Sequence, residues 1–491
     1  MSEPDSIAAS PTDAQGAPHA GRWTLVSRVF AQASQLIVFV FAVRFLSPAE
    51  FGLFALVQAT SVILFIAASA GWREVIVSSV EDQHDIEQVT TYALGSGALL
   101  CIVGLVIAGA IEVFLPGGRA SPLMALFSVC VLAAPVSNAF AGMLVRTGRV
   151  FDFAASSIAA EVVGFVVTLS TLFAGQGVFS LVFGKIAYQV SATALMWFQT
   201  RWFGPFVWRG PRTRLLVSTS VHVFMNRSIL FLQNNGATFV VGAFLGPASV
   251  GFYRAAERVV ASVAELVMEP VRMIAWVYIR RAAERAGDGP GRQAYLAAEA
   301  TRILPIMMMA VSPVLVGLCL VSHDVVTLVL GPEWAPAAPV AAILAISGIS
   351  YVPGTLTEPL LSHIGQVKQM PRILLLNCAV TLVFTFVTGS FGLIPLALST
   401  LASGLFSFIT TLWIMQKYGE LSWRAAARQT RPVIVPLLAM VTVVLLLQWA
   451  GASYGIHRIL ILGVQVPVGA AVYVALLYRV RPDAVQQIVS L

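Results

Sequence analysis

The sequence predicts an all-α polytopic membrane protein with about fourteen transmembrane helices, in two parallel pseudo-symmetric six-helix lobes followed by two further helices. Three observations predict this fold class. Of the 491 residues 58% are hydrophobic and only 11% are charged, whereas soluble domains carry about 25% charged residues. Apolar runs of about 20 residues recur along the chain, and each is long enough to cross a hydrocarbon core of about 30 Å. The chain also contains an internal repeat.

The composition excludes several other classes of protein. A soluble surface cannot be built from so few charges, and four cysteines inside apolar segments have neither disulfide nor metal-ligand spacing. The six histidines are scattered, so we expect no metal site and no cofactor. Residues 1–21 lack the basic start and apolar run of a secretory signal, and we expect a short disordered tail on the cytoplasmic side.

Each predicted helix is an apolar run bounded by glycine, proline or charged residues. The fourteen ranges are 23–44, 51–71, 89–114, 122–145, 153–174, 178–199, 218–244, 250–279, 301–321, 336–362, 371–390, 394–416, 431–450 and 456–478. The last two fall outside a plan of six plus six helices. We therefore expect a lobe over 22–200, a cytoplasmic connector over 201–217, a lobe over 218–417, and an addition over 418–491.

Basic residues orient the helices. With the N-terminus in the cytoplasm, the segments on that side hold 21 arginines and lysines, and the opposite side holds only Arg44, Arg119 and Arg458. This asymmetry places both termini inside. The net charge of +7 is explained by these loops, which face anionic lipid, so no nucleic acid partner is expected.

The internal repeat joins the turn after the first helix to the turn after the seventh. Residues 45–52 (FLSPAEFG) and 244–251 (FLGPASVG) share five of eight positions at an offset of 199. The same offset superimposes Arg28 on Arg227, Arg73 on Arg272, and Gln35 on Asn234. A chance similarity of turns is the alternative. Two parallel halves are typical of transporters that alternate access by rocking around a site at their seam.

Charged residues inside the predicted helices are candidates for function, because a charge at the bilayer centre costs at least ~2.5–3.5 kcal/mol. One face of the eighth helix carries Arg254, Arg258, Glu265, Glu269 and Arg272. This stripe either lines a hydrated central cavity or consists of intrahelical ion pairs. We hypothesise that Glu257, Glu265 or Glu269 couples transport to an ion gradient.

Four arginines at the inner ends of the helices, Arg28, Arg73, Arg227 and Arg272, could form a cationic collar. Arginine binds phosphate oxygens bidentately and keeps its charge. The alternative is ordinary anchoring of the helix ends at the cytoplasmic face. Gln35 and Asn234 suit either sugar recognition or hydrogen bonds between helices.

Missing features narrow the function further. The sequence contains no phosphate-binding glycine-rich loop, and its outer loops are too short to hold a catalytic domain. We therefore expect that the protein is not an enzyme. No run of residues has the character of a selectivity filter. Transport by alternating access is the class of function that remains.

Three segments resemble the Wzx-type polysaccharide flippases of the multidrug/oligosaccharidyl-lipid/polysaccharide exporter superfamily. They are RFLSPAEFGLFAL at 44–56, FLGPASVGFY at 244–253 and LGPEWAPAAPV at 330–340. The resemblance covers residues from about 20 to 480. It implies a protein of the bacterial inner membrane that moves a polyprenyl-diphosphate-linked oligosaccharide to the periplasmic leaflet for exopolysaccharide, capsule or O-antigen synthesis, with a polysaccharide polymerase and chain-length proteins as partners.

The resemblance also implies arginines in a central cavity that meet the diphosphate, and Arg28, Arg227, Arg254 and Arg258 are our candidates. Exporters of cationic drugs in the same superfamily would be expected to carry acidic residues in the first lobe, and the first helix, 23–44, has none. Two alternatives stay open at this point. One is a multidrug or small-solute antiporter of the same superfamily, and the other is a non-transporting scaffold of a polysaccharide-synthesis complex.

Overall fold

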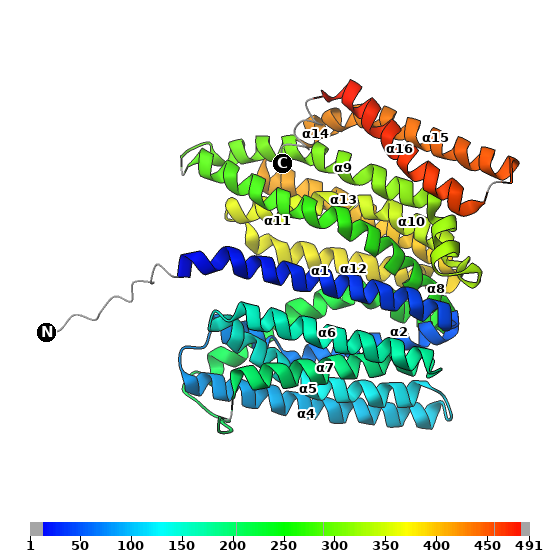
Figure 1. The fold of residues 1–491 in the computed structure, drawn as a ribbon. Helices are drawn as coiled ribbons and strands as arrows, with labels where there is room; N and C mark the ends of the chain where they lie inside the picture. The colour runs from blue at the N-terminus through cyan, green and yellow to red at the C-terminus, as the bar shows by residue number, and fades with distance from the viewer. Residues whose placement is uncertain (1–12, 203, 288, 456, 483–491) are drawn as a thin grey trace. The chain divides into compact units, whose positions relative to one another are not determined.

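The computed structural model describes residues 13–202, 204–287, 289–455 and 457–482, and in these residues all regular secondary structure is helical (Figure 1). Of the predicted tail, residues 1–12 lie outside the described residues. Helix α1 spans Asp13–Phe45, so residues 13–21 are helical, although the sequence suggested disorder there. Once the apolar run has nucleated the helix, each added residue gains a hydrogen bond, which extends it outward.

Thirteen helical segments of the described chain are long and apolar enough to cross a membrane. The longest is α8 (Thr213–Ala286), and within it Gly246 has φ 78° and ψ 176°. This backbone is not helical, so α8 consists of two helices joined at Gly246. Counting both gives fourteen spans, in agreement with the number predicted from the apolar runs.

The helices form two compact units. The first unit contains the residues up to Leu46 and Leu56–Ser228, and the second contains Ser47–Ala55 and the residues from Ile229 onward. Helix α2 (Pro48–Ser69) belongs to the second unit up to Ala55 and to the first unit from Leu56. The helices of the first unit that follow are α3 (Trp72–Ser78), α4 (Gln83–Phe114), α5 (Ala120–Arg146), α6 (Val150–Phe173) and α7 (Phe179–Thr200). Helix α8 belongs to the first unit up to Ser228 and to the second unit beyond it.

The second unit continues with the helices α9 to α16, interrupted by four short 3₁₀ turns. Their bounds are α9 (Arg292–Val329), η1 (Pro332–Trp334), α10 (Ala337–Ile349), α11 (Val352–His363), η2 (Val367–Gln369), α12 (Met370–Thr388), η3 (Gly389–Phe391), α13 (Leu393–Gly419), α14 (Trp423–Thr430), η4 (Arg431–Val433), α15 (Ile434–Ser453) and α16 (Arg458–Val480).

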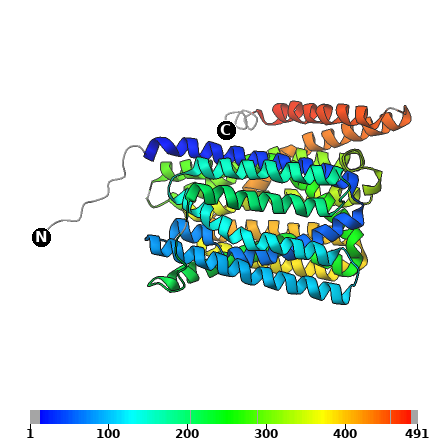
Figure 2. The ribbon, with the colours of Figure 1, turned by 60° about the horizontal axis from the view of Figure 1, so that its bottom comes forward.

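In the first unit α3 packs tightly against α5. A Cβ atom on Gly142 would lie 3.1 Å from the carbonyl oxygen of Arg73, so the two helices approach closely where glycine stands. Ile76 and Leu144 are almost fully buried in the same cluster. Helix α1 lies along α6, where Trp23 meets Phe151 with ring centroids 4.9 Å apart (Figures 1 and 2). This packing gives the first unit a rigid wall behind α3.

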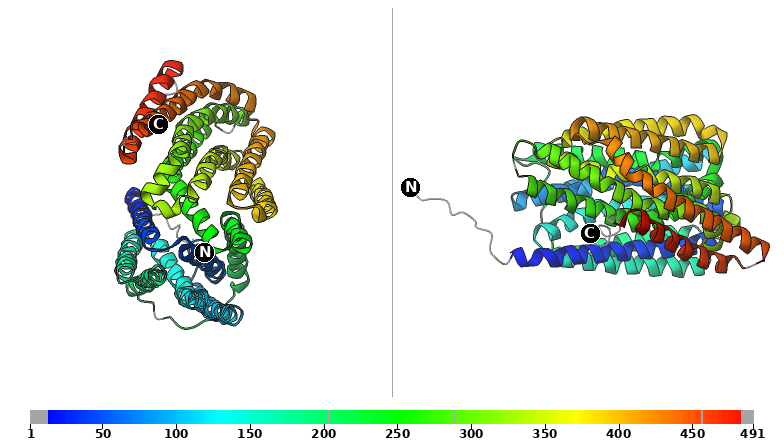
Figure 3. Two further views of the ribbon diagram at one scale, coloured as in Figure 1. Left: turned by 90° about the vertical axis from the view of Figure 1, so that its right-hand side faces the viewer. Right: turned by 90° about the horizontal axis from the view of Figure 1, so that it is seen from above.

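In the second unit the two C-terminal helices, α15 and α16, pair with each other and pack on α9 (Figure 3). The hydroxyl of Tyr473 donates to the carbonyl of Met309 at 2.8 Å, and the amide of Gln448 donates to the carbonyl of Leu320 at 3.0 Å. These bonds attach the pair to one helix of the unit.

The two copies of the repeated turn contact each other reciprocally within the second unit. A Cβ atom on Gly52 would overlap the carbonyl oxygen of Pro247, and one on Gly251 would overlap that of Pro48. Positions 48 and 247, like 52 and 251, differ by the repeat offset of 199. Trp334 is 1% exposed and packs against the ring of Phe51 with centroids 5.7 Å apart. The repeat therefore marks a real packing element.

The structure differs from the predicted helices at two places. The second predicted helix, 51–71, ends at Ser69, and after Ala70 and Gly71, which have φ of 40° and 74°, the short helix α3 follows beyond the predicted range. The tenth predicted helix, 336–362, breaks into α10 and α11 at Ser350 and Tyr351. The sequence predicted neither α3 nor the break at Ser350. The break at Ala70 and Gly71 positions the residues described next.

Candidate functional site

Helix α3 begins directly after the break and carries two adjacent charged residues, Arg73 and Glu74. Neighbouring residues on a helix point about 100° apart. Arg73 accordingly turns toward α6, where its guanidinium carbon lies 4.5 Å from the ring centroid of Phe153. Glu74 turns toward α8. The short helix thus presents a cation and an anion to two different neighbours.

Glu74 forms an ion pair with Arg227 of α8. The Nη2 atom of Arg227 donates to Oε1 of Glu74 at 2.6 Å, and both side chains are 40% exposed. The charges of Glu74 and Arg227 both act on Arg73. The cluster of Arg73, Glu74 and Arg227 therefore contains two cations and one anion, all in the first unit. Of the predicted collar, the structure brings Arg73 and Arg227 together.

Helix α8 contacts the first unit along one face before it reaches Arg227. Arg212 pairs with Asp85 at 3.3 Å and with Glu81 at 2.9 Å. The contact residues that follow on α8 are Thr213, Leu216, Ser220, Val223 and Arg227. Their spacing of three and four places them on one side of the helix. Arg227 lies at the end of this face, one residue before α8 leaves the first unit.

The predicted charge stripe lies in the second part of α8, in the second unit. Arg254 pairs with Glu257 at 2.7 Å, and Arg272 pairs with Glu269 at 2.6 Å. Both pairs are spaced i,i+3, so the stripe includes the intrahelical ion pairs that the sequence left open as an alternative. Its remaining residues differ in exposure: Arg258 is half-buried and Glu265 is exposed. Whether the stripe lines a cavity stays a prediction.

The remaining predicted site residues occupy separate positions. Arg28 and Gln35 are exposed on α1 in the first unit, and Asn234 is exposed on α8 in the second. Gln35 donates a hydrogen bond to Glu161 of α6, which also interacts with the charge of Lys185. The first unit therefore contains a second polar cluster at mid-span, in addition to the cluster around Arg227.

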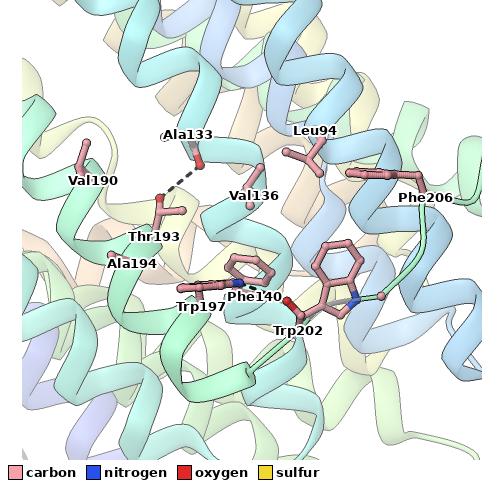
Figure 4. Close-up of a pocket in the computed structure, with 11 residues that line it drawn as sticks. Leu94, Ala133, Val136, Phe140, Val190, Thr193, Ala194, Trp197, Trp202 and Phe206 are labelled. Carbon is pink, nitrogen blue, oxygen red and sulfur yellow. Dashed lines mark hydrogen bonds between the residues drawn. The ribbon is translucent and has the colours of Figure 1, made fainter.

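A cavity of about 640 Å³ lies in the first unit between α4, α5, α7 and the connector after α7 (Figure 4). Its walls are almost entirely carbon, and two of their polar groups bond to backbone carbonyls. Thr193 donates to the carbonyl of Ala133 at 3.4 Å, and the indole of Trp197 donates to the carbonyl of Trp202 at 3.1 Å. None of the predicted cargo-binding residues lines this cavity, and its walls offer no charge for an anionic group.

Sequence reasoning missed Glu74 and Phe153. Glu74 is next to the candidate Arg73 and lies close to an apolar run, so the presence of a charge beside apolar residues could have identified it as it identified the other candidates. Its pairing with a residue 153 positions away cannot be found from helical periodicity, which describes only one helix at a time. In the described residues, no group of three or more histidine, cysteine or acidic side chains is placed to hold a metal ion.

Comparison with known proteins assigns the chain to a family. A family model described as polysaccharide biosynthesis protein matches residues 41–339, more than half of the chain. The chain belongs to this family. The matched range includes both copies of the repeated turn, all of α3 and all of α8. It therefore covers the cluster around Arg227 and the charge stripe.

One curated relative matches nearly the whole length of the chain. The succinoglycan biosynthesis transport protein ExoT of Rhizobium meliloti (strain 1021) is 21% identical over 480 residues, which cover 96% of this chain and 94% of the relative. Two solved structures share the fold. The lipid II flippase MurJ in an inward closed conformation gives a TM-score of 0.72 at 12% identity, covering 95% of this chain and 99% of MurJ.

The second structure is an inward-facing multidrug resistance MATE family transporter of the MOP superfamily, with a TM-score of 0.59 at 16% identity. It covers 79% of this chain and 94% of the transporter. One fold thus includes a lipid-linked saccharide flippase and a drug transporter. The fold alone cannot decide the cargo, which has to be argued from the residues of the site.

Proposed function

We propose that this polysaccharide biosynthesis protein is a flippase that moves a polyprenyl-diphosphate-linked oligosaccharide across the bacterial inner membrane by alternating access. Family membership, a full-length relative named for succinoglycan transport, and a fold shared with a lipid II flippase support the class of cargo. Such a cargo has an anionic headgroup and a lipid tail that stays in the bilayer, so its carrier needs cations beside lipid.

The observation that carries the proposal is the cluster of Arg73, Glu74 and Arg227. Two guanidinium groups lie within candidate membrane spans and share one carboxylate. An excess cation in such a place is expensive unless an anion arrives to meet it. A diphosphate supplies that anion, and arginine binds it with paired hydrogen bonds. A carrier of cationic drugs would need the opposite excess of charge.

The remaining sequence-based assignments belong to the proposal. Both termini lie in the cytoplasm, and the lobes 22–200 and 218–417, joined by the connector 201–217, rock against each other around the cargo site, with 418–491 as an addition. Arg28, Arg254, Arg258 and Arg272 extend the headgroup site, and Gln35 and Asn234 meet the sugars. A polysaccharide polymerase and chain-length proteins receive the product.

We further propose that Glu257, Glu265 or Glu269 binds the coupling ion, although two of these glutamates already form ion pairs. Glu257 and Glu269 each hold an arginine on the same helix. A coupling ion at either carboxylate would release that arginine toward the cargo. Glu265 is exposed and can bind an ion without breaking one of these pairs. Coupling at Glu257 or Glu269 would therefore link ion binding to cargo binding directly.

Neutralisation of the cluster tests the proposal. The double variant Arg73→Gln/Arg227→Gln, in a strain that lacks the native gene, should abolish surface polysaccharide and accumulate the lipid-linked repeat unit in the cytoplasmic leaflet. The control is Arg458→Gln, which removes an exposed arginine at the start of α16 and should leave the polymer unchanged. Protein level in the membrane is measured for each variant.

Two results would overturn the proposal. One is normal polymer production by the double variant at a normal protein level. The other is a gene deletion that leaves the polysaccharide intact and makes the cells sensitive to drugs, which would favour a multidrug antiporter.

A further inference from the structure

The break between α2 and α3 is packed against α8. Ala70 and Gly71 both have positive φ, which alanine adopts unfavourably and glycine adopts readily. The carbonyl of Ala70 accepts a hydrogen bond from the hydroxyl of Ser220 on α8. A Cβ atom on Gly71 would lie 2.6 Å from Cβ of Val223. Contact with α8 therefore stabilises a backbone conformation that the α2–α3 sequence would not hold alone.

The Arg227–Glu74 pair completes this contact one helical turn farther along α8. From Ile229 onward α8 belongs to the second unit. There a Cβ atom on Gly389 would come within 2.5 Å of Val240. A single helix therefore packs on α3 with one half and on the second unit with the other half. The ion pair lies two residues before the point at which α8 passes into the second unit.

The pair is incompletely satisfied. Oε1 of Glu74 accepts from Arg227, but Oε2 is buried and has no hydrogen-bond partner in the described part of the chain. A buried carboxylate oxygen without a partner loses its hydration and gains nothing in return. Arg73 adds a second positive charge to the same cluster. Glu74 is therefore a weak counter-ion for two arginines, and a stronger anion can replace it.

We propose that Glu74 is a built-in competitor for the diphosphate of the cargo, an inference that rests on the proposed function. In the protein without cargo, Glu74 forms the ion pair with Arg227. A diphosphate carries at least two charges and can engage Arg73 and Arg227 together, so it displaces the carboxylate. Phosphate offers fewer charges and a shorter span, and it competes poorly with a carboxylate fixed 2.6 Å from its partner. Glu74 is thus a specificity-determining residue that favours diphosphates.

Displacement has a structural consequence. Once Glu74 is released, α8 loses the ion pair that attaches it to α3, and its contacts at Ser220 and Val223 remain. Cargo binding would then loosen the helix shared by both units. When the cargo leaves, Glu74 returns to Arg227 and restores the contact. Release of cargo is therefore assisted by the competitor.

Binding of inorganic pyrophosphate and inorganic phosphate to the purified full-length protein in nanodiscs tests the inference. Glu74→Gln should raise the affinity for pyrophosphate about tenfold, the ratio expected when an anion no longer competes with a hydrogen bond to a charged group. The preference for pyrophosphate over phosphate should narrow. In cells the same variant should export less polymer, because release loses its competitor. Glu74→Asp keeps the charge and should retain the wild-type preference.

Glu81→Gln is the matched control. Glu81 also pairs with an arginine in the first unit, but Arg212 keeps Asp85 as a second partner. Its pyrophosphate affinity should equal that of the wild type. Suppose that Arg227→Gln abolishes pyrophosphate binding but Glu74→Gln leaves the pyrophosphate affinity unchanged or lowers it. That result would show that Glu74 does not compete with the diphosphate, and the proposed function would still stand. If neither Arg73→Gln nor Arg227→Gln weakens pyrophosphate binding, the proposed headgroup site itself is wrong.

Discussion

At the scale of single residues, three of the candidate arginines form ion pairs with glutamates. Arg227 uses a glutamate on another helix, whereas Arg254 and Arg272 use glutamates on their own helix. The two arrangements differ in consequence. An intrahelical pair neutralises charge without joining elements, but the Arg227–Glu74 pair connects α8 to α3. Only a pair between two helices, such as Arg227–Glu74, can transmit the effect of cargo binding from one helix to the other.

A double-mutant cycle separates structure from cargo binding at Arg254. Arg254→Gln leaves the half-buried Glu257 without its partner, which should lower the stability by about 1–3 kcal/mol. Arg254→Gln/Glu257→Gln removes both charges and should recover most of that loss. Thermal unfolding in detergent measures the stability, and surface polymer measures function. The double variant should still export poorly, because a cargo ligand has been lost. Recovery of both properties would make the pair purely structural.

At the scale of elements, the sequence predicted most helices because each one follows from local composition. The apolar runs gave fourteen spans, and the Pro-x-x-x-Gly turns marked the starts of α2 and of the second part of α8. The end of α2 lies within two residues of the predicted one, but α3 was not predicted, and its contact with α8 includes a hydrogen bond from Ser220 to Ala70, 150 residues away. A similar distance along the chain hid the pairing of Glu74. Individual charges were found from the sequence, but their partners on other helices were not.

The reciprocal glycine contact gives a prediction at this scale. Gly52→Ala and Gly251→Ala each place a methyl group against backbone atoms, which cannot move aside as a side chain can. Each variant should therefore lower the amount of folded protein in the membrane and its thermal midpoint. Gly109→Ala on α4 is the control, because nothing lies within 4 Å of a Cβ atom there. Membrane levels and thermal midpoints equal to those of the control would show that the turns do not need to approach so closely.

At the scale of the whole molecule, the proposal depends on which face of the membrane the loops occupy. A flippase that loads cargo from the cytoplasm needs the cluster of Arg73 and Arg227 near that side. The basic residues of the loops predict this orientation, since arginine and lysine are retained on the cytoplasmic side during insertion. The topology that the loop charges predict must therefore be the one that places Arg73 and Arg227 near the cytoplasmic side.

Labelling of introduced cysteines by a membrane-impermeant maleimide in intact spheroplasts tests that topology. Gln176→Cys lies in the exposed turn between α6 and α7, on the predicted outer side, and should be labelled before lysis. Lys368→Cys lies in the exposed segment between α11 and α12 and should be labelled only after lysis. The native cysteines Cys130 and Cys378 are buried, and the unmodified chain provides the background signal. The reverse pattern would place Arg73 and Arg227 toward the periplasm, where they could receive a cargo only after it had crossed.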